Sequence, residues 1–348
     1  MRLLCNYMDA VLTATFSSTR SSSSSSATTS KKNKKTLRQS LQLQPTHESV
    51  VLMQVSTKII RSPPQRLTDL KTMETLAPAL FGEVLLCLDS KTCRQVAVKR
   101  VDLRCARAQV TIGTEIQVVE SLQQERAIHR KLVAARTTNL LLLEEEIQCG
   151  GNLYLVFPFC SGGDLFDVVR QSPTKGQLPE ATARRFLRDV VCGLLCMKEN
   201  GLAHRDISLE NVLLDAKGVC YVCDFGLATQ HGKLLAPGRV GKVWYMAPEV
   251  FRAKESYNPL TADIWSLGVL LAIMLSGAPL VEKPSSEDRH FRVLSEGGGG
   301  IRNLCQRFPR KLSDQAYDLM EKLLTINPHQ RPTLEQVAKH PFLAPPCR

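Results

Sequence analysis

The stretch His204-Arg205-Asp206-Ile207-Ser208-Leu209-Glu210-Asn211 places an Asp and an Asn five residues apart on what we expect to be one short loop. Asp224-Phe225-Gly226 follows, its Asp thirteen residues after Asn211. Carboxylate and amide oxygens are the ligands that Mg²⁺ prefers, and a folded core does not bury several such polar groups without a use for them. Asp206, Asn211 and Asp224 therefore mark a candidate functional site.

The composition is that of a globular protein with a distinct N-terminal tail. The chain has 348 residues, enough for two lobes with a sizeable core, and 43% of them are hydrophobic and 22% charged. Residues 1–75 hold eleven Lys or Arg and four Asp or Glu, which is +7 of the net charge of +12. Ser21–Ser26 and the cluster Lys31–Lys35 leave this tail too little apolar surface to fold. We expect residues 1–66 to be disordered.

Charge and cysteine content bear on partners and compartment. A basic tail can touch RNA, DNA or an acidic membrane, but a solvated tail explains the same charge, so no nucleic-acid partner is expected. The twelve cysteines show no extracellular framework, which predicts reduced thiols in the cytoplasm, with nuclear import through Lys31–Lys35 as an alternative. No stretch reaches the roughly 18 apolar residues of a membrane span. Ile264–Leu275 is predicted to be a buried helix.

The hydrophobic pattern after residue 66 changes from strands to helices. Strands are predicted at residues 83–88, 95–100, 140–146 and 152–157. One helix is predicted among them, over 118–132, and the pattern after Gly162-Gly163 is mainly helical. This order predicts an α+β fold with a small β-rich N-lobe over about 67–157 and a larger helical C-lobe over about 161–345.

Further motifs give the chain a family resemblance. Val96-Ala97-Val98-Lys99 precedes the loop, and Ala247-Pro248-Glu249 and Asp263–Gly268 follow it. With the loop and Asp224-Phe225-Gly226, they resemble the signature of the eukaryotic protein kinases over residues 67–345. Glu210 and the closing His340-Pro341-Phe342 resemble the serine/threonine branch. The resemblance implies ATP and Mg²⁺ as cofactors and protein Ser or Thr hydroxyls as phosphate acceptors.

The resemblance assigns a role to Lys99. In the family, the lysine of the third strand grips the α- and β-phosphates and is held by a Glu on the next helix. Glu125 is the candidate partner of Lys99. Glu115 and Glu120 are alternatives, because the segment after the strand is longer than usual in the family.

The resemblance also assigns the remaining site residues. Asp206 would orient the substrate hydroxyl, while Asn211 and Asp224 would hold Mg²⁺. Carboxylates at Asp164 and Glu210 would favour basic residues upstream of the target hydroxyl. The nucleotide would contact Gly82, Val84, Ala97, Phe157, Pro158, Cys160, Asp164 and Leu213, with adenine bound by backbone groups at 158–160.

The glycine-rich loop of the family, G-x-G-x-F-G-x-V, is eroded here to Ala77-Pro78-Ala79-Leu80-Phe81-Gly82-Glu83-Val84. The N–H groups of Ala77 and Ala79 can still point at phosphates, but their Cβ atoms restrict close approach. Pro78 removes a donor and stiffens the turn. We therefore expect weaker ATP binding.

A second departure pairs two positions. Ser208 stands where the family carries a Lys that contacts the γ-phosphate, and Lys242 stands where it carries a Thr packed against that Lys. We hypothesise that the two residue types are exchanged. Lys242 would then restore the missing charge beside Asp206.

Two more departures concern regulation and the stack of side chains that links the lobes. Between Gly226 and Ala247 only Thr229 and Tyr245 carry hydroxyls, which predicts activity that does not depend on phosphorylation of this segment. His129, four residues after Glu125, replaces an apolar residue of the stack that links the lobes. Either the stack is loosened there or the expected helix register is shifted.

The sequence therefore predicts a protein serine/threonine kinase. The alternative is a pseudokinase that keeps the fold as a scaffold and transfers phosphate poorly, and the eroded loop and Ser208 favour it. The residues Lys99, Asp206, Asn211 and Asp224 favour an active enzyme. The sequence gives no indication of the oligomeric state.

Overall fold

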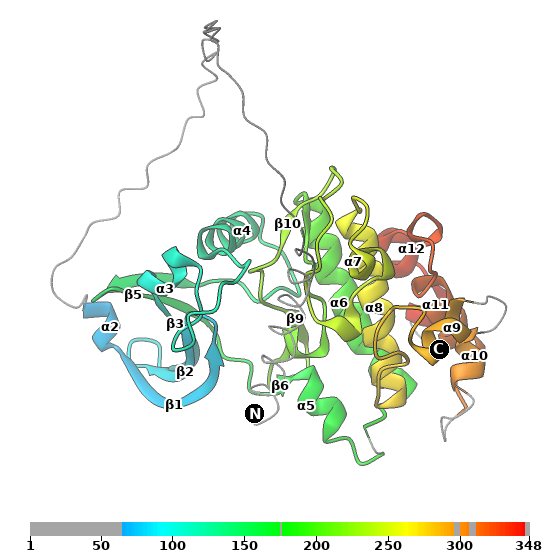
Figure 1. Ribbon diagram of the computed structural model, residues 1–348. Coiled ribbons are helices and arrows are strands. Elements are labelled where there is room, and N and C mark those ends of the chain that lie inside the picture. Colours follow the sequence, from blue (N-terminus) through cyan, green and yellow to red (C-terminus); the bar gives the residue numbers. More distant parts are fainter. Residues whose placement is uncertain (1–64, 175, 296–299, 306–310, 345–348) are drawn as a thin grey trace, which may run out of the picture.

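The computed structural model folds the chain into two lobes (Figure 1). It describes residues 65–174, 176–295, 300–305 and 311–344, so the predicted disorder of the tail lies almost wholly outside the described residues. The smaller lobe is built on one antiparallel sheet with the order β1-β2-β3-β5-β4. Its strands are β1 (Leu70–Ala79), β2 (Gly82–Asp89), β3 (Arg94–Asp102), β4 (Glu145–Cys149) and β5 (Asn152–Pro158). The predicted α+β fold with a β-rich N-lobe is confirmed.

Three helices accompany this sheet: α2 (Gln65–Thr68), α3 (Leu103–Ala108) and α4 (Leu122–Ala134). The helix predicted over 118–132 begins four residues later, because Ser121 has extended backbone and its side chain accepts the N–H of Gln124. Helix α3 was not predicted. It follows directly from β3, where the Asp102 carboxylate accepts the N–H groups of Arg104 and Cys105 as a helix cap.

The strand predicted at 140–146 is wrong at its start. Strand β4 begins at Glu145, and the residues before it pair with the other lobe. The N–H of Leu141 donates to the Val222 carbonyl, and the N–H of Val222 donates to the Asn139 carbonyl. The apolar run 140–143 therefore crosses between the lobes, with Leu140 and Leu141 buried and Leu142 and Leu143 half-buried, and it is not a strand of the N-lobe sheet.

The larger lobe is mainly helical. Its helices are α5 (Leu165–Arg170), α6 (Glu180–Glu199), α7 (Pro248–Arg252), α8 (Pro259–Ser276), α9 (Arg289–Ser295), α10 (Gly300–Cys305), α11 (Asp314–Leu323) and α12 (Leu334–Ala338). Single 3₁₀ turns are η1 (Leu209–Asn211), η2 (Val243–Tyr245), η3 (Pro328–Gln330) and η4 (Pro341–Leu343). Two small sheets, β6-β8-β9 and β7-β10, use β6 (Gly163–Asp164), β7 (Leu202–Ala203), β8 (Val212–Leu214), β9 (Cys220–Val222) and β10 (Thr229–Gln230).

Helix α8 forms the centre of the C-lobe core. Among the described residues it alone is long and apolar enough by composition to cross a membrane, but 83% of it is buried inside the fold. Trp265, Leu267 and Leu270 in this helix are completely buried. The apolar run predicted as a buried helix is therefore a core helix, which anchors the loops that face the N-lobe.

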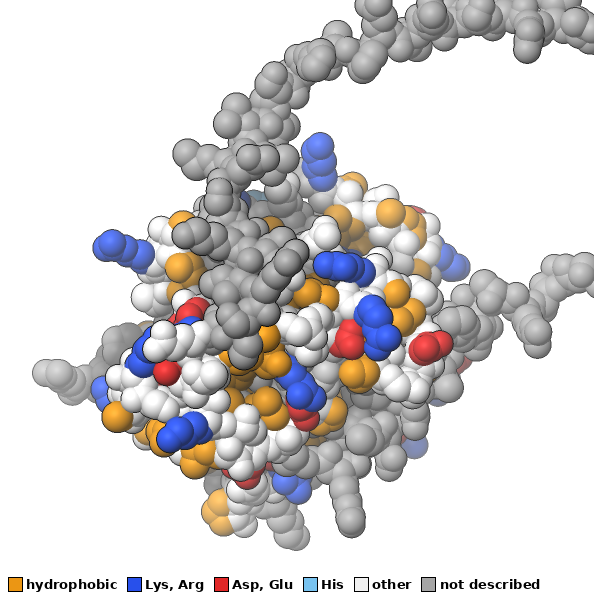
Figure 2. Space-filling model, turned by 90° about the vertical axis from the view of Figure 1, so that its left-hand side faces the viewer, with side chains coloured by type: hydrophobic (Ala, Val, Ile, Leu, Met, Phe, Trp, Pro, Cys, Tyr) orange, Lys and Arg blue, Asp and Glu red, His pale blue; other side chains and the backbone are white. Residues whose placement is uncertain are grey.

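The N-lobe end of the molecule carries charges of both signs. Figure 2 shows Lys and Arg side chains interspersed with acidic and apolar ones over the described part of this face. Some of the basic groups are paired, as in Arg66–Asp89, Arg100–Glu83 and Arg126–Glu146. This face of the described residues therefore offers no single extended basic patch of the kind that binds nucleic acid.

One buried ion pair ties α7 to the rest of the C-lobe. The Arg331 guanidinium, whose side chain is fully buried, donates to both oxygens of the Glu249 carboxylate at 2.7 and 2.8 Å. It also donates to the carbonyls of Thr261, Thr325 and Ile326. The pair thus joins α7, α8 and the segment before η3.

We predict that Arg331→Ala lowers the free energy of unfolding by about 3–5 kcal/mol, because the Glu249 carboxylate would be left buried without its partner. Urea denaturation measures this loss. The matched control is Lys322→Ala, which removes half of an exposed pair with Asp318. That change should cost less than about 1 kcal/mol. Equal effects of the two changes would contradict the prediction.

Candidate active site

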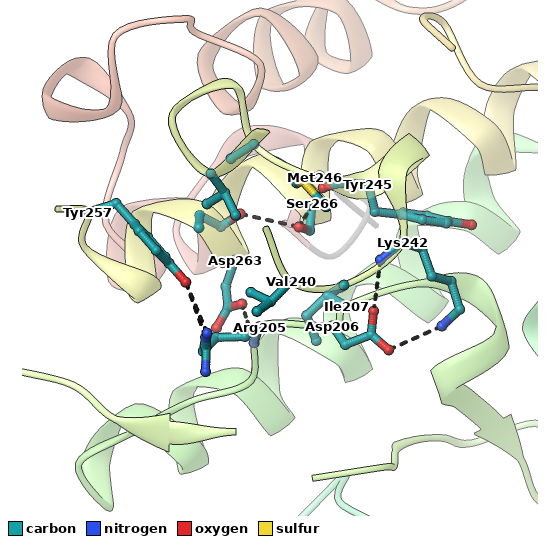
Figure 3. Close-up of a pocket in the computed structure, with 14 residues that line it drawn as sticks. Arg205, Asp206, Ile207, Val240, Lys242, Tyr245, Met246, Tyr257, Asp263 and Ser266 are labelled. Atoms are coloured by element: carbon teal, nitrogen blue, oxygen red, sulfur yellow. Dashed lines mark hydrogen bonds and ion pairs between the residues drawn. The ribbon is translucent and has the colours of Figure 1, made fainter. Parts of the chain in front are cut away.

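The loop that carries Asp206 is fixed to the core by a buried carboxylate. Asp263, in α8, accepts the N–H of His204 at 2.7 Å and the N–H of Arg205 at 2.8 Å. Arg205 adopts a positive φ of 70°, which turns the chain sharply before Asp206. Two backbone bonds to one buried side chain hold this turn in place, and Figure 3 shows Asp263 beside Arg205.

Asp206, Asn211 and Asp224 come together where the loop meets the end of β9. The Asn211 amide donates to the Asp206 carbonyl and to its carboxylate Oδ2, both at 2.8 Å. Asp224 has φ 65°, and its Oδ1 accepts the N–H of Gly226 at 3.2 Å. Burial acts to raise the pKa of Asp224, but the ammonium of Lys99 and this backbone bond outweigh it, and the pKa is lowered. Asp224 is therefore ionised.

Lys99 is paired with Glu125, one of the three partners considered from the sequence. Its Nζ lies 2.7 Å from Oε1 of Glu125, which α4 presents to β3. Burial acts to lower the pKa of Lys99, but the carboxylates of Glu125 and Asp224 raise it overall, so the ammonium stays charged. Glu115, by contrast, is exposed on the segment between α3 and α4.

Glu120, the third candidate, also reaches the site. A Cβ placed on Gly226 would lie 2.8 Å from its Oε2, so the carboxylate lies against the Asp224-Phe225-Gly226 turn. Burial and the charge of Asp224 raise the pKa of Glu120 to about 8. The extra length between α3 and α4 thus brings one more acidic group to the cleft. Sequence reasoning considered Glu120 only as a partner for Lys99.

Several of the residues predicted to line a nucleotide pocket lie together where the two lobes meet. Ala97 faces Phe157 across the β3–β5 ladder, and Val84 faces Lys99 across β2–β3. Ala97, Phe157, Cys160 and Leu213 belong to one apolar cluster. Pro158 ends β5. Asp164 caps α5, where one carboxylate oxygen accepts the N–H of Asp167 at 2.7 Å, which leaves the other oxygen for a ligand.

The eroded loop is a tight hairpin rather than an open turn, with an irregularity in β1 between Thr75 and Ala77. Ala77 pairs with Val84 and Ala79 with Gly82, so only Leu80 and Phe81 form the tip. Gly82 has to be glycine, because a Cβ there would lie 1.9 Å from the Arg100 carbonyl oxygen. Ile112 donates its N–H to the Leu80 carbonyl at 2.9 Å, and Asp102 donates to the Phe81 carbonyl at 2.8 Å. The end of β3 and the segment after it therefore hold the tip in place.

Lys242 lies beside Asp206 and Ser208. Its Nζ is 3.2 Å from Oδ2 of Asp206, and its backbone nitrogen is 3.3 Å from Oδ1 of Asp206 (Figure 3). The same Nζ is 2.9 Å from the Ser208 hydroxyl. The small cavity next to them, between the loop and the segment from 240 to 247, has a volume of about 20 Å³. This is room for one water and not for a nucleotide.

The Arg205 guanidinium donates its hydrogen bonds to uncharged oxygens. Its Nε and Nη2 donate to the Tyr257 hydroxyl at 3.3 and 3.1 Å (Figure 3). Its Nη1 donates to the Leu227 carbonyl at 3.2 Å. Tyr257 is itself buried, and its backbone pairs in both directions with Leu235. Leu235 lies in the segment between Gly226 and Ala247, which we call the activation segment. Sequence reasoning missed Tyr257, because nothing in a single chain connects position 257 with position 205.

His129 lies in the aromatic stack between the lobes, so the helix register expected from the sequence is correct. Its ring centroid is 5.3 Å from that of Phe157 and 4.9 Å from that of Phe225, while His204 lies 5.7 Å from Phe225 on the other side. The Nδ1 of His129 is buried without a partner among the described residues. Burial, together with the charge of Lys99, lowers its pKa to about 4, although Asp224 and Glu146 oppose this shift.

Comparison with known proteins agrees with this geometry. The family model of the protein kinase domain matches residues 71–343. NUAK family SNF1-like kinase 2 of Rattus norvegicus is 33% identical over 273 residues, which are 77% of this chain and 39% of that protein. Serine/threonine-protein kinase grp of Drosophila melanogaster is 32% identical over 271 residues, 77% of this chain and 49% of its own length. Serine/threonine-protein kinase PLK4 of Drosophila grimshawi is 34% identical over 258 residues, which are 73% of this chain and 31% of that protein.

The chain belongs to the protein kinase family. Two of these relatives are named serine/threonine-protein kinases. The chain spans less than half the length of the relatives described above. The two-lobed fold expected from the resemblance is that of this family.

We predict that His129→Leu removes a pH dependence of stability. The unfolded chain binds a proton at His129 below about pH 6.5, whereas the folded one does so only below about pH 4. Stability linked to His129 is therefore complete above pH 6.5 and falls by about 3 kcal/mol as the pH drops to 4.

Urea denaturation at about pH 7 and pH 5 measures this difference. The wild type should lose about 2 kcal/mol more than His129→Leu between the two values, at 1.36 kcal/mol per pH unit. His129→Gln keeps a polar side chain that does not titrate and should behave like His129→Leu. Parallel losses in all three proteins would contradict the assignment.

Proposed function

We propose that the protein is an ATP- and Mg²⁺-dependent kinase that transfers the γ-phosphate to Ser or Thr hydroxyls of protein substrates. One observation carries the proposal. The Lys99–Glu125 pair, the two loop residues Asp206 and Asn211, and Asp224 after β9 come from both lobes and lie close enough to interact. Phosphoryl transfer depends on positioning and charge stabilisation, and these groups supply both.

The donor set fits a magnesium ion. Asn211 uses its amide N–H groups on Asp206, so the atom it has left for a ligand is its Oδ1. Asp224 offers an ionised carboxylate. Both are the hard oxygen ligands that Mg²⁺ prefers, so Asn211 and Asp224 would hold the ion. When bound, it would neutralise charge on the phosphates.

Asp206 is suited to receive the substrate hydroxyl. Its Oδ2 accepts two bonds, from Asn211 and Lys242, and its Oδ1 accepts one, from the Lys242 N–H. A carboxylate can accept about four hydrogen bonds, so Oδ1 keeps a lone pair for the hydroxyl proton. Lys99, held by Glu125, would bind the α- and β-phosphates.

The nucleotide would lie between apolar residues from both lobes. Val84 and Ala97 would cover one face of adenine and Leu213 the other, with Phe157 closing the back. Backbone groups of Pro158 and Cys160 would bind the adenine edge, and the free oxygen of Asp164 would meet the ribose. The N–H groups of Ala77 and Ala79, with Gly82, would cover the phosphates.

Protein substrates with basic residues upstream of the target hydroxyl fit the mouth of the cleft. Asp164 and Glu210 are close enough for the Glu210 charge to contribute to the raised pKa of Asp164, although burial is the larger cause. Two neighbouring carboxylates favour a cationic side chain. We also propose a cytoplasmic location, with nuclear import through Lys31–Lys35 as the alternative; the free thiols of the described cysteines are compatible with both.

A scaffold without efficient transfer is the second candidate, and the hairpin at 77–82 favours it. Ala77 and Ala79 are committed to the β1–β2 ladder, and the tip is held by Ile112 and Asp102. A loop fixed in this way adapts less to a triphosphate. The bracing also keeps the loop ordered over the cleft, which lowers the entropy lost when a nucleotide binds.

The first test is transfer of labelled phosphate from Mg-ATP to a basic Ser/Thr peptide. We expect transfer by the wild type and a loss of at least about 100-fold in Asp224→Ala, because a metal is worth several kcal/mol of charge stabilisation in such a reaction. Asp314→Ala, which removes an exposed carboxylate remote from the cleft, is the control and should keep full activity. A wild type that binds nucleotide and transfers nothing would favour the scaffold.

The second test concerns activation. Arg205 already donates to Tyr257 and Leu227, so it needs no phosphate group as a partner. Phosphatase treatment should therefore leave activity within about twofold. Tyr257→Phe should lower the free energy of unfolding by about 1.5–3 kcal/mol, since a charged donor loses its acceptor.

Tyr154→Phe is the control for Tyr257→Phe, because no hydrogen bond of its hydroxyl is found within the described residues. It should change stability by less than about 0.5 kcal/mol. Loss of activity on dephosphorylation, or equal stability of the two variants, would contradict the role of Tyr257.

A further inference from the structure

The ammonium group of Lys242, in the activation segment, contacts the loop at residues 204–211, which we call the catalytic loop. The Lys242 side chain is 15% exposed and reaches Asp206 and Ser208, which come from a segment more than thirty residues earlier. Ser208 is fully buried, so its hydroxyl is a fixed acceptor for the ammonium. The two contacts position Nζ at the carboxylate that the proposed reaction uses.

Gly241 permits this approach. It has φ 82°, and a Cβ there would lie 2.9 Å from the Arg205 carbonyl oxygen and 3.2 Å from Oδ1 of Asp206. Any other residue would push the segment away from the loop. The backbone N–H and the Nζ of Lys242 can both reach Asp206 because the glycine precedes it.

The ammonium is charged and has a donor to spare. Burial disfavours its charge, but Asp206, Glu210 and Asp224 outweigh this and raise the pKa of Lys242. An ammonium carries three N–H groups, and the described residues accept two of them, one at Asp206 and one at Ser208. The third is available to a ligand beside Asp206.

Holding the segment in place is not a sufficient reason for this contact. The segment is anchored elsewhere, through the backbone pair of Leu235 and Tyr257 and through Arg239, whose Nε donates to the Phe251 carbonyl at 2.7 Å. An ammonium that only neutralised Asp206 would weaken it as a hydroxyl acceptor. The presence of the Lys242 ammonium is explained if its charge also acts on the substrate that Asp206 would face.

We propose that Lys242 is a catalytic residue that donates its third N–H to the transferred phosphoryl group, so that the activation segment supplies the cation which the catalytic loop lacks at Ser208. This inference rests on the proposed kinase activity and names one more residue of the same site. A donor aimed at developing charge in a water-poor site is worth about 10²–10³ in rate.

Lys242 exchanges no atoms in the step. The substrate hydroxyl oxygen forms a bond to the γ-phosphorus, and the bond from that phosphorus to the β–γ bridging oxygen breaks, so that ADP leaves with the electron pair. The hydroxyl proton passes to the Asp206 carboxylate. Lys242 stays an ammonium throughout and stabilises the negative charge on the phosphoryl oxygens.

The experiment exchanges the two residues. Steady-state kinetics with Mg-ATP and a basic Ser/Thr peptide are measured for the wild type, Lys242→Thr, Ser208→Lys and the double variant Ser208→Lys/Lys242→Thr. Lys233→Thr removes an exposed charge from the same segment and is the matched control. Thermal unfolding of each protein shows whether it is folded.

We expect Lys242→Thr to lower kcat about 100-fold and to change the KM for peptide less than about threefold. Ser208→Lys alone crowds two ammonium groups and should also lower kcat. The double variant should regain at least about tenfold over Lys242→Thr, which independent effects of two harmful changes cannot produce. Lys233→Thr should match the wild type.

Three results would overturn the inference while leaving the kinase activity in place: wild-type kcat in Lys242→Thr, a higher kcat in that variant, or a folded double variant without recovery. A variant Lys242→Thr that only raises the KM for peptide and lowers thermal stability would assign Lys242 a structural role. That result would overturn the inference as well. A wild type without transfer would contradict the proposed function itself.

Discussion

The cleft between the lobes gathers more negative than positive charge, and the rest of the site is arranged around this imbalance. The carboxylates of Asp206, Asp224, Glu120 and Glu125 act on one another or on the same ammonium groups, which belong to Lys99 and Lys242. In a water-poor cleft such repulsion is costly unless further cations enter. Burial is the largest cause of the raised pKa of Glu120, about 8, and the negative charge of Asp224 adds to it. A divalent ion at Asn211 and Asp224 would relieve this repulsion.

Each lobe contributes one half of this arrangement. The sheet and α4 fix Lys99 to Glu125, while α8 fixes the catalytic loop through Asp263. The activation segment connects them, since the side chain of Gln124 in α4 donates to the Ala228 carbonyl and Lys242 reaches Asp206. Arg205 is satisfied by Tyr257 instead of a phosphate. The segment is thus held in a formed state by contacts that the unmodified chain already contains.

Much of the fold and the main site were accessible from the sequence because their signals are local. Alternating strands, the 204–211 loop and the Asp224 turn each lie within a few residues. The remaining features depend on contacts between distant positions. Residues 140–143 were assigned to a strand because they are apolar, but their partner is Val222 in the other lobe. Tyr257 and the approach of Glu120 to Gly226 have no local signature at all.

The central claim is that these charges form a site for a magnesium-bound nucleotide. Thermal unfolding of the wild type with ADP alone, Mg²⁺ alone and both together tests it directly. A ligand that binds only the folded state raises its stability, so the account predicts a rise of a few degrees with Mg-ADP and a much smaller one with either component alone. The same rise with ADP in the presence and absence of Mg²⁺, or no rise with Mg-ADP, would contradict it.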